Sequence, residues 1–206
     1  SGYEISEHEK DYLNWRPSVH LSYRTKSMHN FSLSYSRRIA PPSARDLTNY
    51  KFYSTESFST GNLELVPTYT NSVEGGWTKY WEKFGSLGLT AYYRDSRNTV
   101  DNINDVMYDD YFGRYVQYSQ PVNVGKSSRT GLEANVTYRP NAMFNMRLYA
   151  NLYDYYYETK FAKNGELVKD NSLVYSVRLN LWTKLWNKLE IHASGNYRSP
   201  QKSLFA

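Results

Sequence analysis

The 206-residue chain contains no cysteine, which excludes disulfide bonds and thiolate metal sites. It also lacks any stretch close to the roughly 20 consecutive apolar residues that a membrane-spanning helix needs. Leu, Ile, Val and Phe together account for only 42 of the 206 residues, which is little apolar material for a conventional core. These absences argue against a disulfide-stapled protein, a helical membrane protein and a small helical bundle.

The chain is instead rich in tyrosine, with 22 Tyr in an aromatic fraction of 17%. Aromatic side chains favour the half-buried surfaces of β-sheets. A sheet that closes around a polar lumen needs only one apolar face per strand, so a hydrophilic sequence can build it. The composition therefore predicts an all-β protein.

The net charge of +5 does not indicate a nucleic-acid-binding protein. The Lys and Arg residues are scattered along the chain and form no basic block. We interpret them as part of a solvated surface of mixed charge, and no nucleic-acid partner is expected.

Apolar and polar residues alternate in eight segments with the period of two that strands have. Short turns and long loops alternate between these segments. Long loops are predicted at residues 39–67 and 98–128, the second partly extended, and a shorter loop around Asn164 and Gly165. The predicted strands cover residues 13–24, 30–36, 69–78, 87–94, 132–139, 144–152, 173–181 and 189–197.

Outer-membrane barrels have short turns on the periplasmic side and long loops outside. We therefore predict an antiparallel up-and-down (meander) transmembrane β-barrel fragment of about eight strands in four hairpins. Residues 1–206 form one barrel segment in this interpretation. Its short turns are periplasmic and its long loops are extracellular.

Tryptophans gather at two of the short turns, where an aromatic girdle would meet the membrane interface. The predicted girdle residues are Trp77, Trp81, Trp182 and Trp186. The alternative is that these rings close the bottom of a soluble barrel.

The polar face of the predicted strands carries charged residues that would line the lumen of a membrane barrel. The predicted lumen-facing residues are Arg16, Arg94, Glu133, Arg147, Arg178 and Glu190. Alternation alone does not tell which face meets lipid, because a soluble barrel has the same pattern with its apolar face inside. A soluble secreted β-barrel that binds a small apolar ligand therefore remains the alternative.

The long loops are the places where such a scaffold would hold a ligand, and both are rich in aromatic residues. The candidate ligand-binding residues are Tyr50, Phe52, Tyr53, Tyr108, Tyr111, Phe112 and Tyr115. The alternative is that these rings pack the loops against each other.

The sequence indicates no enzyme, metal site or cofactor. The four histidines are far apart and lack the spacing of metal ligands. Nucleophile-elbow, phosphate-loop and dinucleotide motifs are absent. The acidic segment 101–110 lacks the frame of a calcium loop. A carbohydrate-cleaving enzyme would need two carboxylates in one cleft, and no pair suggests itself.

Two segments resemble a known family. The first comprises Tyr35–Pro42, which contains Ser-Arg-Arg-Ile, and the run Thr60–Pro67, which contains Gly61 and Asn62. The second comprises Asn123–Lys126, followed by Gly131–Glu133. They resemble the C-terminal barrel of TonB-dependent outer-membrane receptors, above all the outer membrane protein β-barrel family abundant in Bacteroidetes. Gly61 and Asn62 are expected to use left-handed backbone angles at a loop corner.

The resemblance implies a location in the outer membrane of a Gram-negative bacterium and a part in nutrient uptake powered by TonB. The nutrient would be a glycan, a peptide or a metal chelate. The plug domain and the remaining strands would lie outside this chain. The implied partners are outer-membrane lipid, the protein's own plug domain, the TonB complex and a surface lipoprotein that binds substrate.

Overall fold

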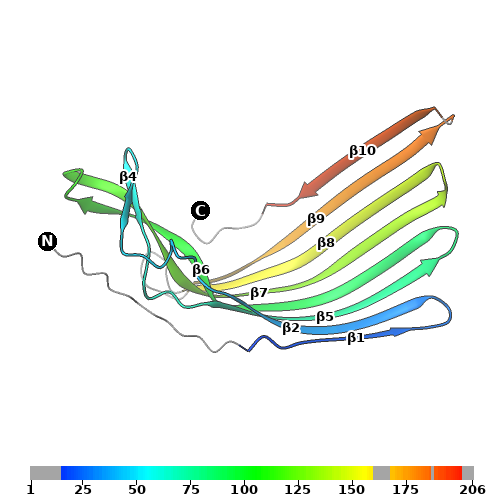
Figure 1. Ribbon diagram of the computed structural model, residues 1–206, viewed down its shortest axis with the longest axis horizontal. Coiled ribbons are helices and arrows are strands. Elements are labelled where there is room, and N and C mark those ends of the chain that lie inside the picture. The colour runs from blue at the N-terminus through cyan, green and yellow to red at the C-terminus, as the bar shows by residue number, and fades with distance from the viewer. Residues whose placement is uncertain (1–14, 160–167, 187, 201–206) are drawn as a thin grey trace.

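The computed structural model describes residues 15–159, 168–186 and 188–200, and within them ten strands form one sheet (Figure 1). Eight long strands follow one another in the order β1-β2-β5-β6-β7-β8-β9-β10, and each neighbouring pair is antiparallel. Their bounds are β1 Ser18–Arg24, β2 His29–Ala40, β5 Thr68–Trp81, β6 Gly85–Asp109, β7 Arg114–Asn141, β8 Phe144–Thr159, β9 Val168–Leu185 and β10 Leu189–Arg198. Two short strands, β3 Lys51–Tyr53 and β4 Ser57–Thr60, lie in the connection between β2 and β5.

The antiparallel meander of hairpins is confirmed. Each predicted strand that falls in the described residues corresponds to one of the eight long strands. The start of the first predicted strand at Leu13 and the predicted loop at Asn164 and Gly165 lie outside the described residues. No helix among the residues described is long and apolar enough to cross a membrane.

The register keeps apolar side chains together on one face of the sheet. Leu21 pairs with Leu33, Leu89 with Ala134, and Leu148 with Leu179. We call this the apolar face. It is not covered by other described parts of the chain, since Leu21 is 60% exposed and Leu132 61% exposed.

The opposite face, the polar face, carries the small buried cluster of Tyr92, Tyr153 and Val174. The residues that would line the dry interior of the soluble-barrel alternative lie on the uncovered face of this sheet. A sheet with one apolar and one polar face, in which the two alternate along every strand, is the arrangement of a membrane barrel wall.

The predicted loop 98–128 is largely a continuation of β6 and β7, which stay paired up to Asp109 and Arg114. This part of the prediction is wrong in extent, because a shift in register interrupts the alternation and β6 beyond it has no regular apolar period, although Val116, Val122 and Val124 lie buried at alternate positions of β7. The register shifts near Asn98, which has a φ of 55°, and Gly125 has a φ of 140°. A Cβ on Gly125 would lie 2.1 Å from the carbonyl oxygen of Glu158, so the bulge requires glycine.

The connection 41–67 is also ordered, since β4 pairs in parallel with β7 from Ser57 and Gln117 onward. The far ends of β6 and β7 and the β3–β4 hairpin therefore lie side by side (Figure 1). Asn123 joins the two segments, because its amide accepts from the Val66 amide at 2.9 Å and donates to the Val66 carbonyl at 3.0 Å.

Gly61 and Asn62 do not use left-handed angles, so that expectation is wrong. Glycine is required at position 61 for a different reason, since a Cβ there would lie 2.5 Å from the carbonyl oxygens of Asp46 and Thr48. The Asn62 amide donates to the carbonyl of Pro121 on β7 at 3.2 Å. The two segments that carry the family resemblance thus fasten the first long connection to the extended hairpin.

Candidate functional site

An ion pair joins the first residue of β3 to the last residue of β6, next to the tip of the β6–β7 hairpin. Lys51 Nζ lies 2.6 Å from Asp109 Oδ2, and Asp109 is 1% exposed. The Tyr53 hydroxyl donates to the same oxygen at 3.4 Å, and the Tyr111 amide donates to Oδ1 at 3.0 Å. A buried carboxylate is costly unless it is paired and hydrogen-bonded, so these donors are what allow Asp109 to be buried.

The ion pair shifts the pKa of both partners. The hydrogen bond from Lys51 holds the pKa of Asp109 below its ordinary value, and the bond to Asp109 raises the pKa of Lys51. Both groups are therefore charged over the whole neutral range.

An aromatic cluster surrounds this pair. The ring of Tyr53 lies 4.7 Å from Tyr111, 5.7 Å from Phe112 and 5.9 Å from Phe58. Lys51 Nζ lies 4.6 Å above the ring of Phe58. Three candidate ligand-binding residues from two separate connections thus meet at one place.

The other four candidates make separate contacts or lie exposed at the surface. Tyr108 and Tyr115 face each other across the β6–β7 hairpin at 5.5 Å, and the guanidinium of Arg45 lies 5.0 Å above Phe52. Tyr50 and Tyr111 are each 74% exposed. Tyr53 and Phe112 therefore serve chiefly to pack the two connections together, while Tyr50, Tyr111 and Tyr115 present exposed rings.

A pocket of about 320 Å³ lies between the first connection and the extended hairpin. Of the seven aromatic candidates, only Phe52 lines it. Its other lining residues could not be recognised from the sequence, because they come from segments far apart in the chain. They are Arg45, Asp46, Ser59, Thr60, Gly61, Asn102, Ser119 and Pro121.

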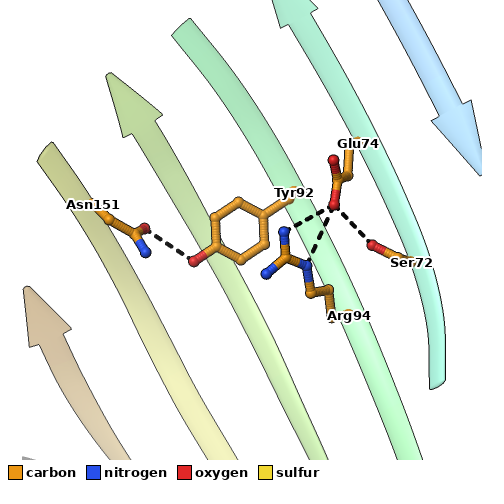
Figure 2. Close-up of polar contacts among 5 residues, drawn as sticks. All are labelled: Ser72, Glu74, Tyr92, Arg94 and Asn151. Carbon is orange, nitrogen blue, oxygen red and sulfur yellow. Dashed lines mark hydrogen bonds and ion pairs between the residues drawn. The ribbon is translucent and has the colours of Figure 1, made fainter. Parts of the chain in front are cut away.

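A second polar assembly crosses the polar face of the sheet (Figure 2). Arg94 donates to Glu74 Oε1 through Nη2 at 2.9 Å and Nε at 3.3 Å, and Ser72 donates to the same oxygen at 3.0 Å. The guanidinium lies 4.4 Å above the ring of Tyr92, whose hydroxyl donates to Asn151 Oδ1 at 3.0 Å. The contacts reach from β5 to β8.

Tyr92 reaches Asn151 because β7 has a glycine in between. Tyr92 pairs with Gly131, and a Cβ on Gly131 would lie 2.7 Å from Cζ of the Tyr92 ring. The absence of a side chain there lets the ring lie across β7. Gly131 belongs to the second segment of the family resemblance, so this is a physical reason for its place in that motif.

A pocket of about 330 Å³ adjoins this assembly on the polar face and is rich in arginine. Arg198 Nη2 donates to the Tyr153 hydroxyl at 3.1 Å, and the guanidinium of Arg129 lies 5.1 Å above the ring of Tyr155. The pocket is lined by Tyr92, Arg94, Arg129, Tyr149, Asn151, Tyr153, Ser176, Val177, Arg178, Asn196, Tyr197 and Arg198.

The register places five of the six predicted lumen residues on the polar face. Arg94 and Arg178 line the arginine-rich pocket, and Arg147 lines a neighbouring one. Glu133 pairs with Asn151, and Glu190 lies 3.5 Å from Lys184. Arg16 precedes β1 and is exposed. The prediction did not include Glu74, Tyr92 or Arg129.

The predicted girdle tryptophans do not share one face. Trp77 lies on the apolar face beside Phe31 and Leu89, and Trp81 lies on the same face. Trp186 occupies a turn and is 82% exposed. Trp182 departs from the prediction, because it follows Leu181 directly and so lies on the polar face between Asn145 and His192.

Among the described residues, no group of three or more His, Asp or Glu side chains could hold a metal ion. The charged side chains of the two assemblies pair with groups of opposite charge or stack on rings. The arrangement can hold a polar ligand by hydrogen bonds, charge and stacking.

The outer membrane protein β-barrel family matches residues 3–206 of this chain. No curated protein matches it. Among solved structures, it is similar to the siderophore receptor PirA from Pseudomonas aeruginosa, with 17% identity and a TM-score of 0.71 over 90% of this chain and 34% of that one.

It is also similar to the ferric enterobactin receptor PfeA from Pseudomonas aeruginosa in a mutant form, with 16% identity, a TM-score of 0.52 and coverage of 88% and 34%. A complex of the same receptor with BCV-L6 has 18% identity and a TM-score of 0.51, with the same coverage. The chain thus spans about a third of the length of these structures. At such identities the likeness shows a common fold.

Proposed function

Because the chain belongs to the outer membrane protein β-barrel family, we propose that it forms part of the barrel wall of a TonB-dependent receptor that imports a nutrient. The observation that supports this best is the two-faced register. One face is apolar and uncovered from β1 to β10, and the other carries charged and tyrosine-rich assemblies. A wall between lipid and a polar lumen requires this division.

In this proposal the chain contributes ligand capture and a path, and covalent chemistry has no part in it. The exposed rings of Tyr50, before β3, and of Tyr111 and Tyr115, at the tip of the β6–β7 hairpin, meet the nutrient outside the cell, since flat rings with polar tips stack on many ligands. The arginine-rich pocket lies below them on the lumen side. Energy would come from TonB through a plug domain outside this chain.

The arginines favour a metal chelate over a glycan or a peptide among the three nutrient classes. Guanidinium groups bind carboxylate oxygens strongly, so they favour an anionic chelate over an uncharged glycan. The structural neighbours are named as siderophore and ferric enterobactin receptors, which supports the same choice.

Extraction from outer membranes tests the proposed location of the apolar face. We expect the protein to remain monodisperse with a β-sheet circular dichroism spectrum only in detergent. A monodisperse β-rich monomer in plain buffer would contradict a membrane wall.

Uptake of a ferric chelate by cells, measured with and without a working TonB complex, tests transport. Uptake that does not depend on TonB would refute the proposed energy source.

A further inference from the structure

The side chains on the apolar face change from apolar to charged near one level of the sheet. Mainly apolar side chains occupy it from the short turns up to Tyr35, Val73, Tyr93 and Leu173, which come from four strands. On β7 and β8 the last apolar residues are Leu132 and Leu152, because Thr130 and Asp154 take the next positions on that face. In β6 this stretch runs from Gly85 to Tyr93, and its length matches the roughly 9 to 11 residues that a bilayer-crossing strand needs. The residues beyond it on the same face therefore lie at the level of the outer headgroups.

A row of charged residues begins there. The register pairs Arg97 with Lys126, Lys126 with Glu158, and Glu158 with Lys169, so these residues lie side by side on β6, β7, β8 and β9. Each is an even number of positions from an apolar-face residue of its own strand, so all four share that face. We call them the outer charged row.

The lysines of this row share a single carboxylate. Glu158 Oε2 lies 3.2 Å from Lys126 Nζ and 3.6 Å from Lys169 Nζ, and it accepts from the Tyr156 hydroxyl at 3.0 Å. Lys126 and Lys169 are about half exposed, whereas the side chain of Glu158 is 19% exposed. Two ammonium groups on one carboxylate leave a positive charge without compensation.

The neighbouring charges on this face, Asp95, Asp154 and Arg37, reduce the surplus of the row from two positive charges to one. Arg97 Nε lies 3.1 Å from Asp95 Oδ2, and Asp154 accepts from the Asn171 amide at 3.2 Å. Arg37, at the same level on β2, lies with its guanidinium 5.1 Å from the centroid of the Tyr69 ring. Tyrosines also lie at this boundary, as they do at membrane interfaces.

We propose that Arg97, Lys126 and Lys169 bind the phosphate of an outer-leaflet lipid whose acyl chains lie on the apolar face below. This rests on the proposed function, because it requires the apolar face to meet the membrane. Phosphate complements the surplus positive charge, and cationic side chains at a membrane surface recognise anionic headgroups. The continuity of the row with the apolar face identifies the occupant as a lipid.

Native mass spectrometry of the protein in detergent tests this, with lipid A that carries two phosphates and its dephosphorylated form as probes. We expect the phosphorylated lipid to bind more tightly. In the double variant Lys126→Gln/Lys169→Gln, its affinity should fall on the order of tenfold. The matched control is Lys79→Gln/Lys83→Gln, which removes the same charge at the short-turn end and should bind like the unaltered protein.

Glu158→Gln tests the same site in the opposite direction. It removes the carboxylate that competes for both lysines, so binding of phosphorylated lipid A should tighten. This variant keeps the inference falsifiable if the double variant does not fold. Equal binding of both lipids, or unchanged binding in both Lys126→Gln/Lys169→Gln and Glu158→Gln, would overturn it.

The same experiments distinguish a failure of the proposed function from a failure of the phosphate site alone. If the protein needs no detergent and binds neither lipid, the apolar face does not meet a membrane and both proposals fail. If the protein needs detergent but the variants do not change lipid binding, only the phosphate site is refuted.

Discussion

At the scale of single residues, Asp109 is the group on which the outer assembly depends. Its carboxylate is buried, and its partner Lys51 comes from a connection 58 residues earlier in the chain. The backbone pairing that attaches the β3–β4 hairpin to β7 is short, since β4 and β7 share only three residue pairs. The ion pair is therefore expected to decide whether the β3–β4 hairpin stays in place.

Asp109→Asn is predicted to loosen that hairpin. Asn cannot compensate the Lys51 ammonium, so residues 51–60 should exchange their amide hydrogens faster, while the strands β8 and β9 stay protected. Hydrogen exchange followed by mass spectrometry measures this. Asp110→Asn is the matched control, because Asp110 is exposed; equal exchange in the two variants would contradict the role of Asp109.

The pH dependence of the same hairpin follows from the two pKa shifts. Because the pKa of Asp109 is lowered, its contribution is complete above its ordinary value of 3.8 and is lost as pH falls through the lowered pKa. Because the pKa of Lys51 is raised, its contribution is complete below 10.5 and is lost above that value.

Proteolysis of the hairpin should therefore be constant between about pH 5 and 9 and increase only at the acidic and alkaline extremes. Cleavage within 51–60, measured over this range with a protease of broad pH tolerance, checks it. A transition near pH 6.5 would point to another group.

At the scale of secondary-structure elements, the contacts on the polar face depend on a position in β7 that has no side chain, Gly131. Gly131 lets Tyr92 of β6 reach Asn151 of β8, so three strands share one buried ring. The same strands carry the arginine-rich pocket. A side chain at 131 would therefore disturb the lumen wall without touching the apolar face.

Gly131→Ala is predicted to destabilise the folded protein by about 1–3 kcal/mol, the usual cost of overpacking. The added methyl would displace the Tyr92 ring and break its bond to Asn151. Thermal unfolding in detergent measures the loss. Gly75→Ala is the control, since a Cβ there meets nothing within 4 Å; similar losses in both variants would show that backbone effects alone are responsible.

At the scale of the whole molecule, the central question is which face of the sheet meets lipid. Leu132 and Asn135 lie on β7 within the same stretch, on opposite faces, and both are exposed. A membrane wall treats these positions differently, whereas an open sheet in water would treat a charge at either position alike.

Leu132→Arg is predicted to cost about 1–2 kcal/mol of stability in a bilayer, because Leu132 lies between the midplane of the lipid face, where an Arg costs about 2–4 kcal/mol, and its outer boundary, where the cost falls to about 0–1 kcal/mol. Asn135→Arg on the polar face should cost much less. Denaturant unfolding in lipid vesicles compares the two variants. The reverse order of stabilities would mean that the apolar face points away from lipid.

Much of the fold could be predicted from the sequence alone. The period of two is local, and a one-residue slip would move every apolar side chain to the other face, so the pattern specifies both the strands and their register. Even the position of Trp182 on the polar face follows from the alternation around Leu179 and Leu181, although its clustering with Trp186 suggested otherwise.

Only the tertiary structure decided what the long connections do. The parallel pairing of β4 with β7 and the ion pair of Lys51 with Asp109 leave no periodic signal, and the extension of β6 and β7 begins at a shift in register that interrupts the alternation. The ion pair and the parallel pairing join residues that are far apart in the chain. The sequence by itself thus determined the two-faced wall, because alternation is a local property, while the outer assembly arose from long-range contacts that only the folded chain brings together.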